Sequence, residues 1–174
     1  MKTRIIIRNS LLMVILFSTI SLASGQDKKR VAVISMDTKE IPYSSEAITS
    51  LLHLELEKLN KFEVLDKYDV SDILKANSIT NDACLGKACQ VKVGKLLKSD
   101  KMISGSVEKF GNKVIIVLRL IDVDKDIIEK TDVMEYISQL DDVQIMIQLS
   151  LSNLLGLSSD QKMKELLVFY AQPL

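Results

Sequence analysis

Apolar residues along this chain fall into short runs and helical stripes that predict alternating strands and helices. Two apolar runs, 31–36 (VAVISM) and 62–65 (FEVL), are typical of strands. Between them, apolar residues at helical spacing predict an amphipathic helix that starts at Ser44 or Ser45 and ends near Leu59. This strand, helix and strand predict a βαβ unit.

The second half of the chain continues this alternation. We expect a short helix from Asp69 or Ser71 to Ala76, and a second helix over 88–98. Three strands should follow, over 101–109, 113–123 and 127–137, joined by turns at Gly111-Asn112 and at 124–126. A last helix of the domain should start at Ser138 or Asp141 and stop at Gly156. The pattern predicts an α/β fold: a single domain with a mixed sheet of about five strands, a βαβ unit followed by an antiparallel meander, flanked by helices.

The two ends of the chain differ from this domain. Residues 1–25 carry a basic start, an apolar run and small residues before Gln26, which is the order of a secretory signal peptide. An uncleaved signal anchor is the rival interpretation. Residues 26–157 form the predicted domain, and 158–174 form a predicted amphipathic helix that can pack on its own domain or dock on another protein.

Composition excludes some classes of function. Without residues 1–25 the chain has 20 basic and 23 acidic residues, a formal charge of −3. This lacks the excess of positive charge that binding of nucleic acid requires. Aromatic residues make up 5% of the chain and there is no tryptophan, which argues against a stacking platform for sugars or bases. No segment after the signal is long and apolar enough to span a membrane.

Cys84 and Cys89 are the only cysteines, and export would expose them to oxidising conditions. We expect a disulfide between them that adds about 2 kcal/mol of stability. A redox dithiol is the alternative, but the spacing is C-x₄-C rather than C-x-x-C. A metal site would need further ligands, and His53 is the only histidine.

A family resemblance rests on three stretches of sequence. The first strand reads VAVISM, and FEVLDKYDVSDIL follows the first helix. The strongest match runs from Cys84 and CQVKVGKLL through ISGSV and the turn Gly111-Asn112 to LRLID, which ends at Asp122. In these stretches the chain resembles the exported α/β domain shared by the curli-secretion protein CsgG, the N-terminal domain of TolB and the penicillin-binding-protein activator LpoB.

The resemblance implies an exported protein at the periplasm or the periplasmic face of the outer membrane. Unlike CsgG-type lipoproteins, the chain has no cysteine at its predicted cleavage site and no room for long amphipathic hairpins, so pore formation is not carried over. Peripheral association with the outer membrane is compatible with the sequence, which does not indicate an oligomeric state.

Other candidate chemistry favours structural roles. His53 is expected to be exposed, and Ser104 and Ser106 to be small residues inside a strand. The D-x-D-x-D spacing that starts at Asp122 lacks the later ligands of a calcium loop and predicts a solvated turn. Glu55 lies within the apolar arc of its helix and should meet a basic residue or backbone amides.

The sequence therefore predicts an exported, non-enzymatic protein-interaction module of the cell envelope, for assembly, secretion or cell-wall regulation. It predicts no catalytic residues, no cofactor and no metal, and its expected partner is an envelope protein. The first alternative is a periplasmic binding domain for a small molecule or envelope polymer, which would have a polar concavity at the carboxyl ends of its strands. The second is an unrecognised hydrolase or thiol enzyme.

Overall fold

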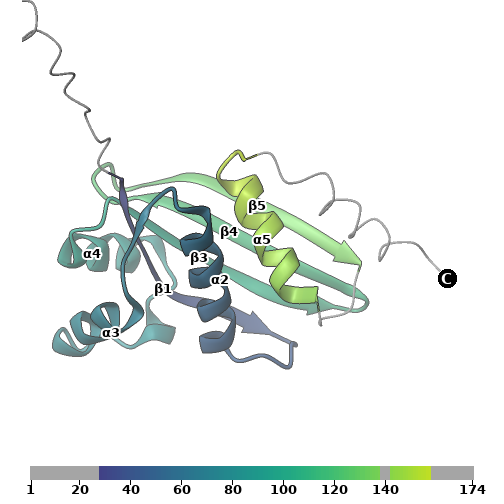
Figure 1. Ribbon diagram of the computed structural model, residues 1–174. Helices are drawn as coiled ribbons and strands as arrows, with labels where there is room; N and C mark the ends of the chain where they lie inside the picture. The colour runs from purple at the N-terminus through teal and green to yellow at the C-terminus, as the bar shows by residue number, and fades with distance from the viewer. Residues whose placement is uncertain (1–27, 138–141, 158–174) are drawn as a thin grey trace, which may run out of the picture.

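A five-stranded mixed sheet organises the chain in the computed structural model, which describes residues 28–137 and 142–157 (Figure 1). The elements in chain order are β1 (Arg30–Lys39), α2 (Ser45–Leu59), β2 (Glu63–Val64), α3 (Lys67–Ala76), the 3₁₀ turn η1 (Asn81–Ala83), α4 (Lys87–Leu97), β3 (Lys101–Phe110), β4 (Lys113–Asp122), β5 (Ile127–Ile137) and α5 (Val143–Leu154). The predicted signal peptide and C-terminal helix lie outside the described residues.

The strands lie in the order β2-β1-β3-β4-β5. β1 is parallel to both β2 and β3, and the β3-β4 and β4-β5 pairs are antiparallel. This confirms the predicted single α/β domain with its βαβ unit and meander. The apolar strand β4 lies inside the sheet, as its sequence predicts, because both of its neighbours are hydrogen-bonded to it.

Helices cover both faces of the sheet, but to different extents. One face packs against α2 and α5 in a core that contains Val33 and Leu118. The alternate residues of the same strands, such as Ile34 and Met102, pack against α3 and α4 on the other face. In Figure 1, α2 and α5 cross one face of the sheet, whereas α3 and α4 gather at one end of it.

The start of α2 confirms the predicted cap. The Ser44 hydroxyl accepts a hydrogen bond from the Ala47 amide, and the helix ends at Leu59. The start of α3 corrects the prediction, because Asp66 rather than Asp69 or Ser71 caps it by accepting from the Tyr68 amide at 2.7 Å. Because Asp66 caps α3 five residues before Ser71, the strand that precedes this helix is shorter than predicted.

β2 is accordingly shorter than the four residues predicted. It pairs with β1 only through Glu63 and Val64, since the chain turns into α3 directly afterwards. Leu65 still donates its amide to the Val31 carbonyl. Its side chain is buried in the second core, which is the apolar cluster between the sheet and helices α3 and α4. Beyond this point, no strand of the described residues pairs with β1 on that side.

Two glycines allow close packing at the centre of the domain. A Cβ at Gly94 of α4 would lie 2.6 Å from the Val123 side chain, so this glycine brings the helix close to the sheet, as the sequence predicts. At Gly105 of β3 a Cβ would lie 1.9 Å from the Val117 carbonyl oxygen. The predicted hairpin between β3 and β4 is also confirmed, with Gly111 at φ +64°.

α5 begins at Val143 after Asp142, whose side chain makes no capping hydrogen bond to the helix. Ser138 and Asp141, the caps predicted from sequence, lie outside the described residues. Gly156 at φ +65° ends the helix, as predicted.

Candidate functional site

A polar pocket of about 450 Å³ lies where β1 extends past the end of β2. Its apolar lining comes from β1 and α3, and its polar lining comes mainly from α2 and α3. The lining residues are Val33, Ile34, Ser35, Ser44, Ser45, Glu46, Thr49, Ser50, His53, Lys67, Tyr68, Val70, Ser71, Leu74 and Asn81. We call this cavity the α2–α3 pocket.

Side chains of α2 replace the missing strand partner of β1. Ser45 and Thr49 lie one helical turn apart on α2. The Met36 amide donates to the Thr49 hydroxyl at 2.9 Å, and the Ser45 hydroxyl donates to the Met36 carbonyl at 2.5 Å. These two bonds satisfy a backbone edge that would otherwise be unpaired, which lets β2 stop early.

His53 continues this row of α2 one turn further, and its position corrects the sequence prediction. Its side chain is only 12% exposed rather than solvated. Its Nε2 lies 2.8 Å from the Leu65 carbonyl oxygen, so this nitrogen carries the proton, and Nδ1 lies 3.5 Å from a carboxylate oxygen of Glu57. The helix flank that sequence periodicity assigns to solvent is covered because α3 starts immediately after Leu65.

The α2–α3 pocket lies at a switch point of the sheet. α2 follows β1 on one face, and α3 follows β2 on the other face. Ligands of open α/β sheets bind in the crevice that such divergent connections leave at the carboxyl ends of the strands. Hydroxyl groups dominate its polar lining, and Lys67 and Glu46 supply one charge of each sign. The pocket can therefore offer hydrogen bonds to a small polar molecule.

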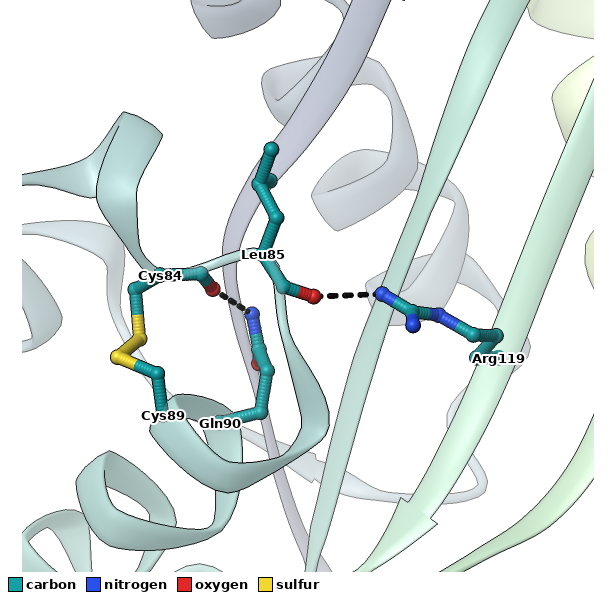
Figure 2. Close-up of a disulfide and its surroundings, with 5 residues drawn as sticks. All are labelled: Cys84, Leu85, Cys89, Gln90 and Arg119. Atoms are coloured by element: carbon teal, nitrogen blue, oxygen red, sulfur yellow. Dashed lines mark hydrogen bonds between the residues drawn. A yellow bond between two sulfur atoms is a disulfide. The ribbon is translucent and has the colours of Figure 1, made fainter.

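The predicted cysteine pair lies beside this region (Figure 2). Cys84 and Cys89 form a disulfide with an S–S distance of 1.98 Å, and the described residues contain no free cysteine. The disulfide closes the loop between η1 and α4, and Cys84 is fully buried in the second core. The Gln90 side-chain amide donates to the Cys84 carbonyl at 2.6 Å, which fixes the loop on the first turn of α4.

Arg119 ties the same loop to the sheet, as Figure 2 shows. Its guanidinium donates to the Leu85 carbonyl at 2.6 Å and to the Ser104 hydroxyl at 3.0 Å. This explains the one charged residue of β4 between its two charged ends, Lys113 and Asp122. Ser104 is buried as a hydrogen-bond partner of Arg119, and Ser106 is half-buried on the same face.

Asp122, Asp124 and Asp126 lie at the turn between β4 and β5, and Asp122 is buried whereas the other two are exposed. This corrects the prediction that the whole turn is solvated. Asp122 is buried and binds the Lys101 ammonium at 2.7 Å, and Glu129 binds the same ammonium. The hydrogen bonds from Lys101 and from the Lys125 amide lower the pKa of Asp122 to about 2. Only Asp124 and Asp126 are exposed.

Burial lowers the pKa of Lys101, but its hydrogen bonds to Asp122 and Glu129 outweigh burial and leave that pKa above 10.5. Asp126 pairs with Lys87 of α4 at 2.5 Å, which lowers the pKa of this carboxyl. Both pairs therefore join the β4-β5 turn region to other elements and leave no calcium loop.

Glu55 contacts a basic residue, as predicted, and its side chain is buried. One carboxylate oxygen accepts from the Lys58 ammonium at 2.7 Å and from the Gln144 amide of α5 at 2.8 Å. Glu55 therefore joins α2 to α5, which is a structural role.

One part of the sheet is left uncovered by the described helices. We call it the open face: Phe110 of β3, Ile115 and Val117 of β4, and Val133 and Ile137 of β5. Val117 lies directly opposite Val133, and strand alternation puts these residues on the side of α4 but beyond its end. Phe110 is 78% exposed and Val133 58%. The sequence analysis missed this surface, although the alternation within 127–137 carries the signal.

No protein-family model matches the chain, and no curated protein matches it. Solved structures do match. The LpoB C-terminal domain from Salmonella enterica has a TM-score of 0.55 at 13% identity, over 65% of this chain and 86% of that one. The domain from Escherichia coli has a TM-score of 0.55 at 15% identity, over 64% and 83%.

Lipoprotein GNA1162 from Neisseria meningitidis also matches, with a TM-score of 0.55 at 14% identity, over 76% of this chain and 99% of that one. The likeness is one of fold. It supports the LpoB part of the expected resemblance. TolB from Acinetobacter baumannii matches at a TM-score of 0.48, too low to argue from, and the likeness to CsgG stays a prediction.

Two negative observations apply to the described part of the chain. No helix in residues 28–137 and 142–157 has the length and hydropathy to cross a membrane. Within the same ranges, no three side chains among His, Cys, Asp and Glu are grouped to hold a metal ion.

Proposed function

We propose that this protein is an exported, non-enzymatic interaction module of the cell envelope that binds a partner protein through the open face. The observation that carries this proposal is a group of five apolar side chains, two of them more than half exposed, on one surface of an otherwise well-packed domain. Exposed apolar side chains that gather on one surface mark protein interaction sites more often than ordinary surface. Strand register places polar side chains among them: Lys113 and Glu135 form an exposed ion pair at 2.8 Å, and Glu135 lies between Val133 and Ile137 on β5.

The edge of the sheet extends this surface. β5 is eleven residues long, and in the described residues it pairs only with β4. A long edge strand with unpaired backbone groups is a template for an added strand unless it is covered. The open face and this edge are contiguous, so one partner can contact both.

Three further features support an envelope role. The N-terminal segment has the order of a secretory signal, and the disulfide suits an oxidising compartment. The fold is shared with LpoB domains and with a protein named as a lipoprotein, GNA1162. Together these favour assembly, secretion or cell-wall regulation at the periplasmic side of the envelope.

The side chains of the α2–α3 pocket do not favour the alternative of a histidine-dependent hydrolase. Activation of a serine by histidine requires a ring nitrogen that accepts the hydroxyl proton. In His53 one nitrogen bonds the Leu65 carbonyl, and the other faces Glu57. Neither of the two contacts is with a hydroxyl group.

Photo-crosslinking tests the proposal. A crosslinking amino acid replaces Val133 on the open face or, as a control, Leu54, which is 41% exposed on α2. After irradiation of intact cells, we expect a discrete adduct of higher mass from position 133 that Ile137→Asp abolishes. Equal adducts from both positions, or none from position 133, would contradict the proposal.

A second candidate function is the binding of a small polar molecule, and the α2–α3 pocket is the observation that favours it. A polar concavity at the carboxyl ends of β1 and β2 is the feature expected of the alternative binding domain. NMR titration of the mature chain with N-acetylglucosamine and with glycerol phosphate tests it. Shifts grouped around Thr49, His53 and Ser71, and lost in Ser71→Trp, would support it; unchanged spectra would reject these two ligands.

A further inference from the structure

The end of the sheet where β1 and β3 begin carries charged and apolar side chains that the proposed function does not use. We propose that this end binds the surface of a membrane that contains anionic lipids. We call it the basic end, and it consists of the second half of α4 and of residues 28–30, 57–63, 98–101 and 122–128. Strand pairing places it at the opposite end of the sheet from Phe110 and Ile137 of the open face, so the inference does not rest on the proposed function.

Four segments that are distant in the sequence are joined at the basic end. The Arg30 amide donates to the Asp100 carboxylate at 2.7 Å, and the Asp100 amide donates to the Arg30 carbonyl at 2.9 Å. The Val123 amide donates to the Asp100 carbonyl at 3.1 Å, and the Glu63 amide donates to the Lys29 carbonyl at 3.0 Å. Figure 1 shows the start of β1 and the β4-β5 turn at the same end of the sheet. These bonds hold the four segments together as one surface.

The basic end has an excess of positive charge. Glu63 pairs with Arg30 at 3.3 Å, and Asp122 and Glu129 share the Lys101 ammonium. Within the described residues, the acidic side chains at this end without a lysine or arginine partner are Glu57, Asp100 and Asp124. Within the same residues, the exposed lysines at this end that form no ion pair are Lys28, Lys29, Lys61, Lys92, Lys95 and Lys98. This end is therefore positive although the mature chain has a formal charge of −3.

Exposed apolar side chains lie at the same end as these lysines. Leu96 is exposed in the last turn of α4, and Ile127 and Ile128 are exposed at the start of β5. Ile127 pairs with Asp122 in the sheet, which places it beside the segment that Val123 joins to β3. Surfaces that bind membranes combine apolar side chains, which enter the headgroup region, with lysines, which reach the phosphates. A soluble polyanion would be bound by the lysines alone, so the apolar side chains favour a membrane.

The size of the electrostatic effect follows from this charge. A lysine close to an anionic membrane strengthens binding about fivefold, so an excess of about three positive charges favours an anionic over a neutral membrane by about a hundredfold. Salt at about 0.1 M limits this attraction to charges within about 10 Å of the headgroups. β3 rises about 30 Å from Lys101 to Phe110 at roughly 3.3 Å per residue. Lysines at the far end of β3, such as Lys109, therefore lie beyond this range when the basic end faces the membrane.

Sedimentation with lipid vesicles tests the basic end. The mature chain is used, because the apolar signal segment would itself bind lipid. We expect about a hundredfold tighter binding to vesicles of phosphatidylglycerol and phosphatidylcholine than to phosphatidylcholine alone at low salt, and a loss of this difference at high salt. The double variant Lys29→Glu, Lys61→Glu should bind the anionic vesicles at least about twentyfold more weakly. The control Lys39→Glu, Lys109→Glu has the same net charge but changes the far ends of β1 and β3, so it should bind within about twofold of the unaltered chain.

A single introduced tryptophan reports which surface enters the membrane, because the chain has no tryptophan of its own. Leu96→Trp places the reporter on the basic end, and Phe110→Trp places it at the opposite end of β3. Both positions are exposed, so neither change disturbs the core. When anionic vesicles are added, the fluorescence of Leu96→Trp should shift to shorter wavelength, whereas that of Phe110→Trp should not change.

The outcomes distinguish the possible ligands of the basic end. The inference is overturned if the unaltered chain does not bind anionic vesicles, or if Lys29→Glu, Lys61→Glu binds them no more weakly than the control pair. Binding of heparin or duplex DNA without a fluorescence shift of Leu96→Trp on vesicles assigns the lysines to a soluble polyanion and also overturns it. The crosslinking experiment at position 133 is read separately, so either proposal can fail while the other stands.

Discussion

The buried ion pair between Lys101 and Asp122 leads to a quantitative prediction about stability and pH. The folded state lowers the pKa of Asp122 from 3.8 to about 2. One pKa unit corresponds to about 1.4 kcal/mol, so the ionised carboxyl contributes about 2 kcal/mol to folding at neutral pH. Only 9% of the Asp122 side chain is exposed, so solvent screening reduces this value little.

The sign follows from the direction of the pKa change. A carboxyl whose pKa is lower in the folded state stabilises the protein fully above its unfolded pKa, and this stability is lost as the pH falls through 3.8 toward 2. At pH 3 about 1 kcal/mol should be gone. Lys101 acts in the opposite direction: its raised pKa gives stability below pH 10.5 that is lost at higher pH.

Urea unfolding followed by circular dichroism measures this effect. The perturbation is Asp122→Asn, and Asp124→Asn in the same turn is the control because Asp124 is exposed. The free energy of unfolding of Asp122→Asn should fall at least about 2 kcal/mol below that of the unaltered chain at pH 7, and this gap should narrow by about 1 kcal/mol at pH 3. A gap that does not change between pH 6 and pH 3, or the same narrowing in Asp124→Asn, would refute the reasoning.

Three further predictions concern the core. Replacing both Cys84 and Cys89 with alanine should lower the unfolding free energy by about 2 kcal/mol, because the loop is short, and dithiothreitol should then have no further effect. Gly94→Ala should destabilise by about 1–3 kcal/mol in urea unfolding despite better helix propensity, because its Cβ would meet Val123; the same change in a Val123→Ala background should be neutral or stabilising. Tyr136→Phe should cost about 1–2 kcal/mol, since the buried hydroxyl donates to a backbone carbonyl, and burial, which raises the pKa of Tyr136 to about 12, should delay its ultraviolet titration.

Errors in the sequence analysis cluster where distant segments meet. Because His53 lies away from the apolar stripe of α2, the sequence pattern predicts that its side chain is exposed. In the structure α3 covers this side chain, because β2 pairs with β1 through only two residues and α3 starts soon after it. Asp122 looked like a turn residue because its partner Lys101 is twenty-one positions away in sequence and joins it only through strand pairing. The α2–α3 pocket depends on the same short β2.

Local chemistry explains what could be predicted. Apolar periodicity gave the strands and helices, the Ser44 cap and the Gly111 turn, because these depend on neighbours within a few residues. The order of strands followed from the βαβ unit and the meander, whose connections are short.

By itself, then, the sequence determined the helices and strands and the fold class. It also predicted that its only two cysteines pair. Tertiary structure alone decided which surfaces are available for function. Whether a strand face is covered depends on where helices from other parts of the chain end, and α4 ends before it reaches Val133 and Ile137. The same non-local packing leaves β1 longer than β2, and the α2–α3 pocket lies where β1 extends beyond it. Function is sought on these two surfaces because burial is a property of the assembled layers and is not encoded in any one segment.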